Sequence, residues 1–300
     1  MTNTVPSPAA PPPAASSGAA SSGAASSGAA SSGAASSAAA AAGPLPPDPL
    51  PAHDVAGPAD GPAVVLLHSS VCDRRMWQAQ WGPLAEAGFR VVRMDFRTCG
   101  ETPPATAPYR DEDDVLELMD HLGIERAALV GSSYGGRVAL QIAARHPGRV
   151  TRLALVCTAL PGHTPSPALR EVGEREDALL EAGDVEAAVE LMVDTWLGPS
   201  APEEAKEFVR TMQRRGFEVA RTVAEDHELP AHPVDLAAVT APTLAFGGAY
   251  DHPDFRGIAA SVPQSVPGAR HVELPWAGHL PSLERPQEMT ALLLEFLGRP

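Results

Sequence analysis

Residues 127–148 read AALVGSSYGGRVALQIAARHPG, and this stretch decides the fold. The first part, 127–133, is a short apolar run that ends in small residues, which is typical of a buried strand. The second part, 134–148, has the apolar spacing of a helix, and Pro147 ends it. A strand that leads directly into a helix is the first half of a β-α-β unit, so the stretch predicts part of a parallel sheet.

The same alternation of strands and helices continues on both sides of this stretch. Short apolar runs predict further strands, and amphipathic runs between them predict helices. The predicted strands are AVVLLHSS (63–70), FRVVRMDF (89–96), VTRLALVCT (150–158), APTLAFGG (241–248) and ARHVELP (269–275), and the predicted helices are DEDDVLELMDHLGI (111–124) and PQEMTALLLEFLG (286–298). The expected fold class is therefore α/β, with a mostly parallel central sheet flanked by helices.

The alternation breaks at residues 161–235, where three helical stretches follow each other without a strand. The clearest is DVEAAVELMVDTWLG (184–198), with Asp184 as the N-cap and apolar residues at helical spacing. We therefore expect an α/β core formed by residues 44–160 and 236–300, with 161–235 as an inserted helical cap.

Residues 1–43 differ from the rest in composition. The unit AASSG occurs four times in succession between Ala14 and Gly33. So short a unit, without a large side chain, has nothing to bury and does not predict a stacked repeat. Ala, Ser, Gly and Pro without aromatic residues predict a disordered low-complexity tail. The segment that follows, 44–61, is Pro-rich and is expected to include an early edge strand.

The charge and the cysteines limit the classes of partner. A formal net charge of −15 argues against binding to nucleic acid or to anionic membranes. The three cysteines, Cys72, Cys99 and Cys157, are scattered and lack metal-ligand spacing. The chain shows no signal-peptide pattern and no apolar run of membrane-spanning length. We expect a cytoplasmic protein that acts on a small molecule without a cofactor or metal, and the sequence leaves the oligomeric state open.

The stretch GSSYG carries the first candidate for chemistry. It matches G-x-S-x-G with Gly131, Ser133 and Gly135 in the three defined positions, and it lies between a strand and a helix. In that setting the serine sits on a tight, strained turn above the sheet, and the N-terminus of the helix favours negative charge. Ser132 occupies the variable position. The pattern predicts that Ser133 is a nucleophile.

A nucleophilic serine needs a base and an acid that orients the base. Each follows a late strand, Asp251 in FGGAYD (246–251) and His279 in WAGHLPSLERP (276–286). The C-terminal ends of parallel strands meet at one edge, where such sheets build their sites. Taken alone, Asp251 reads equally well as a turn residue and His279 as a surface or helix-capping residue. Asp254 is the alternative acid.

Five motifs in order, from about Ala63 to Gly298, resemble the α/β-hydrolase family, in its large group with a helical lid inserted after the sixth strand. LLHSSVCDRRMW resembles the family's His-Gly-x loop that leads to a Trp, and MDFRTCGET resembles its Asp-x-Arg-Gly-x-Gly-x-Ser loop. GSSYGG, GGAYD and AGH complete the set. The resemblance implies a catalytic triad of Ser133, Asp251 and His279.

The resemblance also implies an oxyanion hole made by the backbone N–H groups of Ser70 and Tyr134. Two positions depart from the family, because Ser69 and Thr98 each stand where the family has Gly. These departures bear more on the assignment of Ser70 than on the triad. The remaining polar and aromatic residues of the motifs are expected to be structural: His68, Trp77, Arg97 and His271.

A complete triad implies a serine hydrolase that cleaves a small-molecule ester or lactone through an acyl-enzyme on Ser133. The stretch HSSVCDRRMW resembles the enol-lactone hydrolases of aromatic catabolism. Two alternatives stay open: the same triad acting on the C–C bond of a diketone or in cofactor-free perhydrolysis, and a non-catalytic ligand-binding homologue. Haloalkane dehalogenases and epoxide hydrolases of this family use Asp as nucleophile, so Ser133 argues against both.

Overall fold

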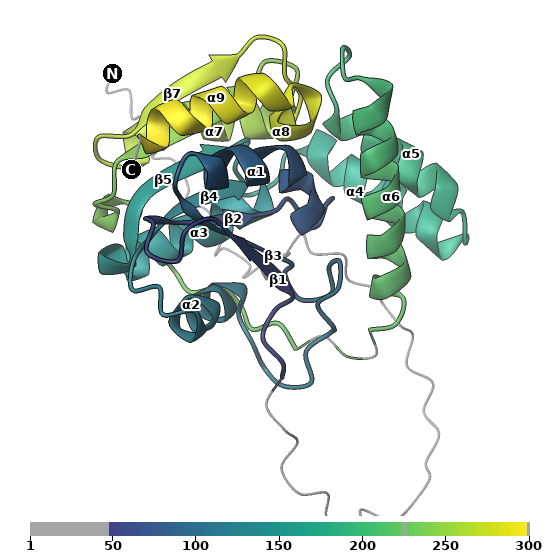
Figure 1. Ribbon diagram of the computed structural model, residues 1–300. Helices are drawn as coiled ribbons and strands as arrows, with labels where there is room; N and C mark the ends of the chain where they lie inside the picture. Colours follow the sequence, from purple (N-terminus) through teal and green to yellow (C-terminus); the bar gives the residue numbers. More distant parts are fainter. Residues whose placement is uncertain (1–47, 224, 226, 299–300) are drawn as a thin grey trace, which may run out of the picture. The chain divides into compact units, whose positions relative to one another are not determined.

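The computed structural model describes residues 48–298, except 224 and 226. Within this range a seven-stranded sheet has the order β1-β3-β2-β4-β5-β6-β7 (Figure 1). The strands are β1 (His53–Ala56), β2 (Ala63–Leu67), β3 (Arg90–Met94), β4 (Ala127–Ser132), β5 (Val150–Val156), β6 (Thr243–Gly248) and β7 (Arg270–Leu274). β1 pairs antiparallel with β3, and every other neighbouring pair is parallel. The predicted fold class, a mostly parallel sheet, is confirmed; the predicted tail, 1–43, lies outside the described residues.

The sheet separates two hydrophobic cores because successive side chains of a strand point to opposite faces. In β2, Val64 and Leu66 belong to one core, and Val65 and Leu67 belong to the other. A strand covered on both faces reads as a continuous apolar run, as this one does. Helices α1 and α9 cover the first core, and α2 and α3 cover the second (Figure 1). Their bounds are α1 (Gln78–Glu86), α2 (Asp111–His121), α3 (Tyr134–Arg145) and α9 (Pro286–Leu297).

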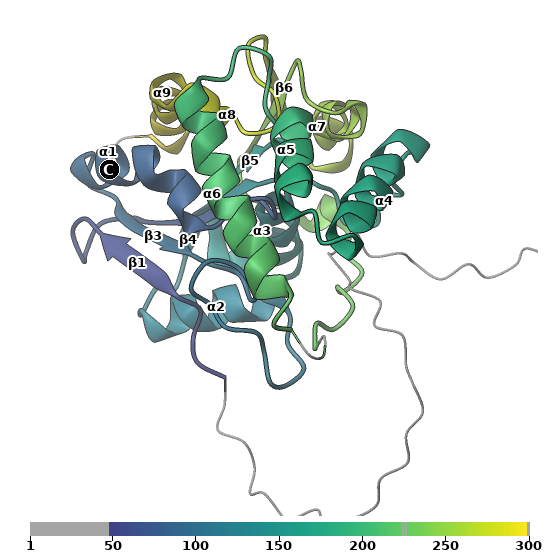
Figure 2. The same cartoon turned by 90° about the vertical axis from the view of Figure 1, so that its right-hand side faces the viewer.

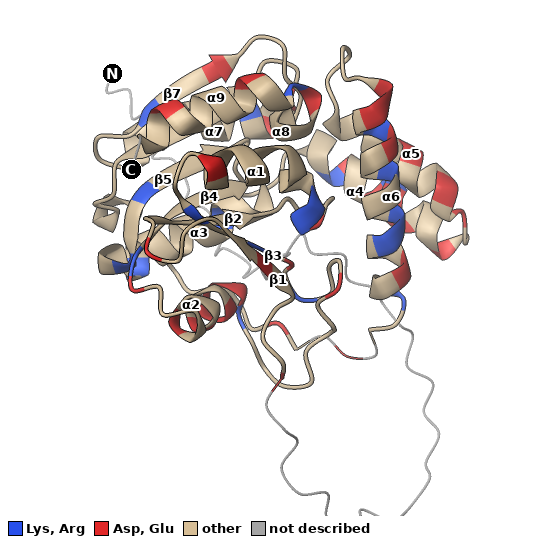
Figure 3. Cartoon of the chain, in the orientation of Figure 1, with Lys and Arg blue, Asp and Glu red and all other residues tan. Residues whose placement is uncertain are grey.

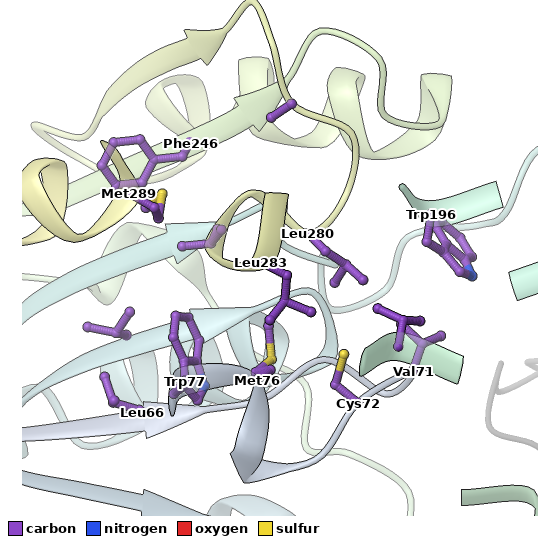
Figure 4. Packing of buried hydrophobic residues seen from close by; sticks show 14 of the residues in the cluster. Leu66, Val71, Cys72, Met76, Trp77, Trp196, Phe246, Leu280, Leu283 and Met289 are labelled. Atoms are coloured by element: carbon purple, nitrogen blue, oxygen red, sulfur yellow. The ribbon is translucent and has the colours of Figure 1, made fainter. Parts of the chain in front are cut away.

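The first core is built around large side chains that are excluded from solvent. Trp77 and Phe246 are both fully buried. Figure 4 shows this packing from close by, with Trp196 and Leu280 at the end of the core nearest the inserted helices. The expectation that Trp77 is structural agrees with its position, because it packs within this core rather than against solvent. Burial of this kind contributes about 2–3 kcal/mol per large side chain.

Three helices occupy the segment between β5 and β6, namely α4 (Pro167–Glu181), α5 (Val185–Trp196) and α6 (Glu203–Ala220). We call them the inserted helices; they lie together beside the sheet (Figures 1 and 2). Asp184 caps α5 as predicted, because its side chain accepts a hydrogen bond from the backbone N–H of Ala187. The insertion lies between β5 and β6, within the segment 161–235 that was expected to break the alternation of strands and helices.

Acidic and basic residues lie along α5 and α6 (Figure 3). Arg210 of α6 bonds Glu190 of α5 at 2.7 Å, and Arg214 bonds Glu186 at 2.7 Å. Their inner surface is apolar and joins the first core. No helix among the described residues is long and apolar enough to cross a membrane.

Candidate active site

Ser133 lies in the turn between β4 and α3, in a backbone conformation that few non-glycine residues adopt. Its φ is 50° and its ψ is −112°. Close neighbours explain the two glycines of the motif. A Cβ on Gly131 would lie 2.3 Å from the carbonyl oxygen of Gly135, and a Cβ on Gly135 would lie 2.4 Å from the carbonyl oxygen of Leu67. The chain therefore turns sharply enough to hold Ser133 at the end of the strand, as a nucleophile elbow requires.

His279 and Asp251 form a buried pair. Asp251 follows β6 and His279 follows β7, and the exposed fractions of their side chains are 0% and 2%. His279 Nδ1 lies 2.9 Å from each carboxylate oxygen of Asp251. The backbone N–H of His252 donates to Asp251 Oδ1 at 2.7 Å, which holds the carboxylate in place.

The alternative acid, Asp254, belongs to a different set of contacts. Its carboxylate accepts a hydrogen bond from the backbone N–H of Ser166 at 2.8 Å and lies 3.3 Å from His163 Nε2. These contacts join the start of α7 (Pro253–Ser265) to the start of α4. Asp251 is therefore the acid that the structure brings to His279.

Cys157 connects Ser133 to the Asp251–His279 pair. The backbone N–H of Ser133 donates to the carbonyl of Val156 at 2.9 Å, and the carbonyl of Ser133 accepts from the backbone N–H of Ala159 at 3.0 Å. Ser133 is therefore hydrogen-bonded to the backbone on both sides of Cys157. The sulfur of Cys157, a carboxylate oxygen of Asp251 and a ring nitrogen of His279 lie within 4.8 Å of one another. All three predicted residues thus gather at one edge of the sheet, although among the described residues no hydrogen bond joins the Ser133 hydroxyl to His279.

Cys157 was not predicted to belong to the site. Its only signal was its position near the end of the predicted strand 150–158, which leads to the same edge of the sheet as Ser133. It adopts a φ of 46°, another left-handed conformation. The spacing of Cys157, Asp251 and His279 could accommodate a metal ion. Burial, however, raises the pKa of the Cys157 thiol well above its usual value, so the thiol is protonated at neutral pH and is a poor metal ligand.

Two aromatic rings enclose the imidazole of His279. The ring centroid of Phe255 lies 4.3 Å away and that of Trp196 lies 4.7 Å away. The backbone N–H of His279 also donates to the carbonyl of Trp196 at 2.8 Å. Trp196 is the last residue of α5, so an inserted helix contacts both the ring and the backbone of the predicted base. The sequence left open whether Trp196 packs in the core or faces a pocket, and it did not predict that Phe255 lies here.

His68 holds the loop that carries Ser70. Its Nε2 accepts a hydrogen bond from the backbone N–H of Phe96 at 3.0 Å, so its Nδ1 carries the proton and donates to the carbonyl of Ser69 at 2.8 Å. Burial lowers the pKa of His68, which keeps the ring neutral. The carbonyl of His68 accepts from Gly135, which places the Ser70 loop beside the turn that carries Ser133. His68 therefore holds the backbone of this loop in place, which agrees with the expectation that it is structural.

Ser70 and Tyr134, the two predicted oxyanion donors, flank this contact. Among the described residues, no acceptor is bonded to the backbone N–H of either one. The two departures from the family behave differently. Thr98 keeps a left-handed φ of 66°, at a cost of roughly 1–2 kcal/mol for a residue with a Cβ. Ser69 needs no such conformation, and its backbone N–H donates to the sulfur of Met76 at 3.3 Å.

Arg97 is structural, as expected. Its guanidinium forms two hydrogen bonds with the carboxylate of Asp114, at 2.7 and 3.0 Å, and both side chains are almost fully buried. The pair joins the loop after β3 to the first turns of α2. A bidentate pair of this kind holds the loop in one orientation.

Tyr134 carries an acidic neighbour of unusual pKa. Its hydroxyl donates to Asp111, the first residue of α2. Burial, followed by the negative charges of Glu228 and Asp114, raises the pKa of Asp111 to about 7, although the hydrogen bond from Tyr134 acts in the opposite direction. Asp111 is therefore half protonated near neutral pH in the folded protein.

Replacing Asp111 with Asn is expected to change how stability depends on pH. The unfolded chain releases this proton near the ordinary pKa of an aspartate, 3.8, whereas the folded protein keeps it until about pH 7. The folded wild type therefore loses stability as the pH rises through this window, by a few kcal/mol at about 1.4 kcal/mol per pKa unit. Thermal melts from pH 4 to 8 should show a flatter profile for Asp111→Asn. The exposed Asp113→Asn serves as the control, and identical profiles for all three proteins would contradict the assignment.

Comparison with known proteins agrees with this fold. The family model for the alpha/beta hydrolase fold matches residues 62–286. A curated relative from Variovorax paradoxus (strain S110), named "Putative carbamate hydrolase RutD", is 33% identical over 266 residues, which cover 82% of this chain and 96% of the relative. A hydrolase structure from Pseudomonas aeruginosa PA01 is 33% identical with a TM-score of 0.67, and covers 82% of this chain and 93% of its own.

A second solved structure, the enol-lactonase from Burkholderia xenovorans LB400, is 28% identical with a TM-score of 0.67. The match covers 82% of this chain and 95% of the enol-lactonase. The family match spans most of the described sheet and includes Ser133, Asp251 and His279. The chain is therefore an enzyme of the alpha/beta hydrolase family.

Proposed function

We propose that this protein is a serine hydrolase that cleaves a small-molecule ester or lactone, with Ser133 as nucleophile, His279 as base and Asp251 as the acid that orients it. The observation that carries the proposal is the buried hydrogen bonding of His279 Nδ1 to both oxygens of Asp251, each at 2.9 Å. Because Nδ1 is hydrogen-bonded to Asp251, Nε2 is the ring nitrogen that can accept the proton of the serine hydroxyl.

The proposed reaction proceeds in two halves. His279 takes the proton of Ser133 as the serine oxygen attacks the carbonyl carbon, and the carbonyl oxygen becomes negatively charged. The backbone N–H groups of Ser70 and Tyr134 then donate to this oxygen, and the N-terminus of α3 adds a favourable dipole. His279 gives its proton to the leaving alcohol. Water, activated by the same imidazole, releases the acid and restores Ser133.

The inserted helices form the cap of the proposed site. The ring of Trp196 packs against His279. The indole N–H of Trp196 donates a hydrogen bond to the sulfur of Met192, on the same helix, at 3.2 Å. An apolar wall beside the base favours a substrate without charge near the scissile bond. The enol-lactonase likeness supports the same class of substrate.

We also place the protein in the cytoplasm, since Cys72, Cys99 and Cys157 are all free thiols.

Labelling with a fluorophosphonate probe tests the nucleophile. Wild type is expected to form a covalent adduct of one probe per chain, and Ser133→Ala is expected to form none. Ser132→Ala is the matched control because it removes the adjacent hydroxyl, which is buried and has no partner among the described residues. An unlabelled wild type, or equal labelling of Ser133→Ala, would end the proposal.

A substrate panel tests the class of bond. Short- and medium-chain p-nitrophenyl esters, lactones and ring-fission diketones should be compared, each with and without peroxide. The proposal requires turnover of esters or lactones in the absence of peroxide. Turnover of diketones alone, or formation of peracid alone, would mean that the same triad catalyses a different reaction and would overturn the proposed ester or lactone hydrolysis.

A further inference from the structure

Glu284 is a buried acid that the proposed mechanism does not use. It ends the short helix α8 (Pro281–Glu284), and only 5% of the residue is exposed. Among the described residues, no Lys, Arg or His nitrogen lies within 4.0 Å of its carboxylate. A buried carboxylate without a cation is costly unless hydrogen bonds compensate it.

Backbone N–H groups on both sides of His279 provide that compensation. The N–H of Gly278 lies 3.0 Å from each oxygen of Glu284, and the N–H of Leu280 lies 3.2 Å from Oε1. The N–H between them, that of His279 itself, donates to Trp196. Every backbone N–H group from 278 to 280 therefore has an acceptor, and Glu284 is the acceptor for two of these three N–H groups.

Glu284 also reaches the inserted helices. Its Oε2 accepts a hydrogen bond from the backbone N–H of Gly198, just past the end of α5, at 3.2 Å. The two backbone segments touch, since a Cβ on Gly278 would lie 2.3 Å from the nitrogen of Gly198. One carboxylate thus joins the segment that carries His279 to the end of the helix that carries Trp196.

The carboxyl group of Glu284 has a raised pKa. Burial raises it, and the hydrogen bonds from the N–H groups of Gly278, Leu280 and Gly198 act in the opposite direction without cancelling the rise. The titratable groups around His279 are Asp251 after β6, Glu284 on α8 and the protonated thiol of Cys157 after β5.

We propose that Glu284 is a positioning residue for the reaction: its carboxylate holds the backbone on both sides of His279 and joins that segment to Gly198 at the end of α5. The proposal rests on the proposed function in that His279 is the base. Glu284 does not contact the substrate and transfers no proton.

The Glu284→Gln variant tests this role, because Gln keeps the shape but removes the charge and turns an N–H group toward backbone donors. We expect kcat/KM to fall about 100-fold, the effect of a misplacement of about 1 Å in an active site. We also expect the loss to fall on kcat rather than on KM, because Glu284 acts on the position of the base and does not contact the substrate. Glu112→Gln is the matched control, since Glu112 is equally buried on α2 and is paired with Arg145.

The outcomes separate positioning from mere structure. A wild-type rate, or a rate loss that only follows the folded fraction and leaves kcat per folded molecule unchanged, overturns the proposal. If Glu284→Gln does not fold, Glu284→Asp carries the test, because it keeps the charge on a shorter side chain. We then expect a reduced kcat with KM near that of wild type, and a wild-type rate overturns the proposal.

A second readout keeps this inference separate from the proposed function. The NMR signals of the His279 imidazole at a fixed pH require no turnover and report the position of the ring. Changed imidazole signals in Glu284→Gln, with a wild type that neither labels nor hydrolyses, would leave the positioning role standing and the proposed function overturned. An active, labelled wild type with unchanged imidazole signals in the variant would overturn the positioning role alone.

Discussion

Replacing Asp251 with Asn is expected to lower kcat for ester hydrolysis by about 10,000-fold, the loss seen when a triad acid becomes an amide. The Asn side chain would fill the same buried space. It would, however, present an N–H group toward His279 Nδ1, which reverses the tautomer and leaves Nε2 protonated and unable to accept the serine proton. Steady-state kinetics on the preferred ester or lactone measure the loss.

Asp254→Asn is the matched control for this change. Asp254 lies three positions further along the chain and was the alternative acid, yet its carboxylate contacts Ser166 and His163 rather than His279. We expect kcat within about threefold of wild type for this control, in line with a change outside the catalytic unit. A larger loss in Asp254→Asn than in Asp251→Asn would reverse the assignment of the acid.

Replacing His279 with Ala is expected to lower kcat by about one millionfold, the largest effect that we predict, because the serine then has no base. Members of a triad act as a unit, so the double variant Ser133→Ala/His279→Ala should be no slower than either single variant. Fluorophosphonate labelling of Ser133 should also slow in His279→Ala. Stopped assays over long incubation times measure residual rates of this size.

His271→Gln provides the control for the loss of an imidazole. His271 lies within β7 and was expected to be structural. A rate near that of wild type is expected. A double variant slower than the singles by the product of their separate losses would show that Ser133 and His279 act independently, which contradicts the triad.

The strands and the helices beside the candidate site could be predicted because each has one dominant local pattern. β2 is a continuous apolar run, and α3 begins directly after the Gly-rich turn. Helices α1 and α7 were not predicted. Gly82 and Pro83 interrupt the pattern of α1, and Pro263 lies near the end of α7. Both helices are stabilised by packing on the sheet, which local propensity does not express.

The candidate site divides in the same way. Ser133, Asp251 and His279 could be proposed because motif order and strand ends place them at one edge. The partners of His279 could not, since Trp196 and Phe255 come from separate helices, and Glu284 contacts it only through backbone groups. The departure at Thr98 was visible, but the sequence alone does not show that the backbone there stays left-handed.

The close contact between Gly198 and Gly278 bears on how the specificity of this enzyme can diverge. Two backbone segments that touch leave no volume for a side chain, so substitution at either position is disfavoured. The wall beside His279 is therefore constrained, whatever substrate the enzyme uses. Adaptation to a new substrate has more freedom in α4 and α6, whose exposed and half-buried positions can exchange side chains without moving the base.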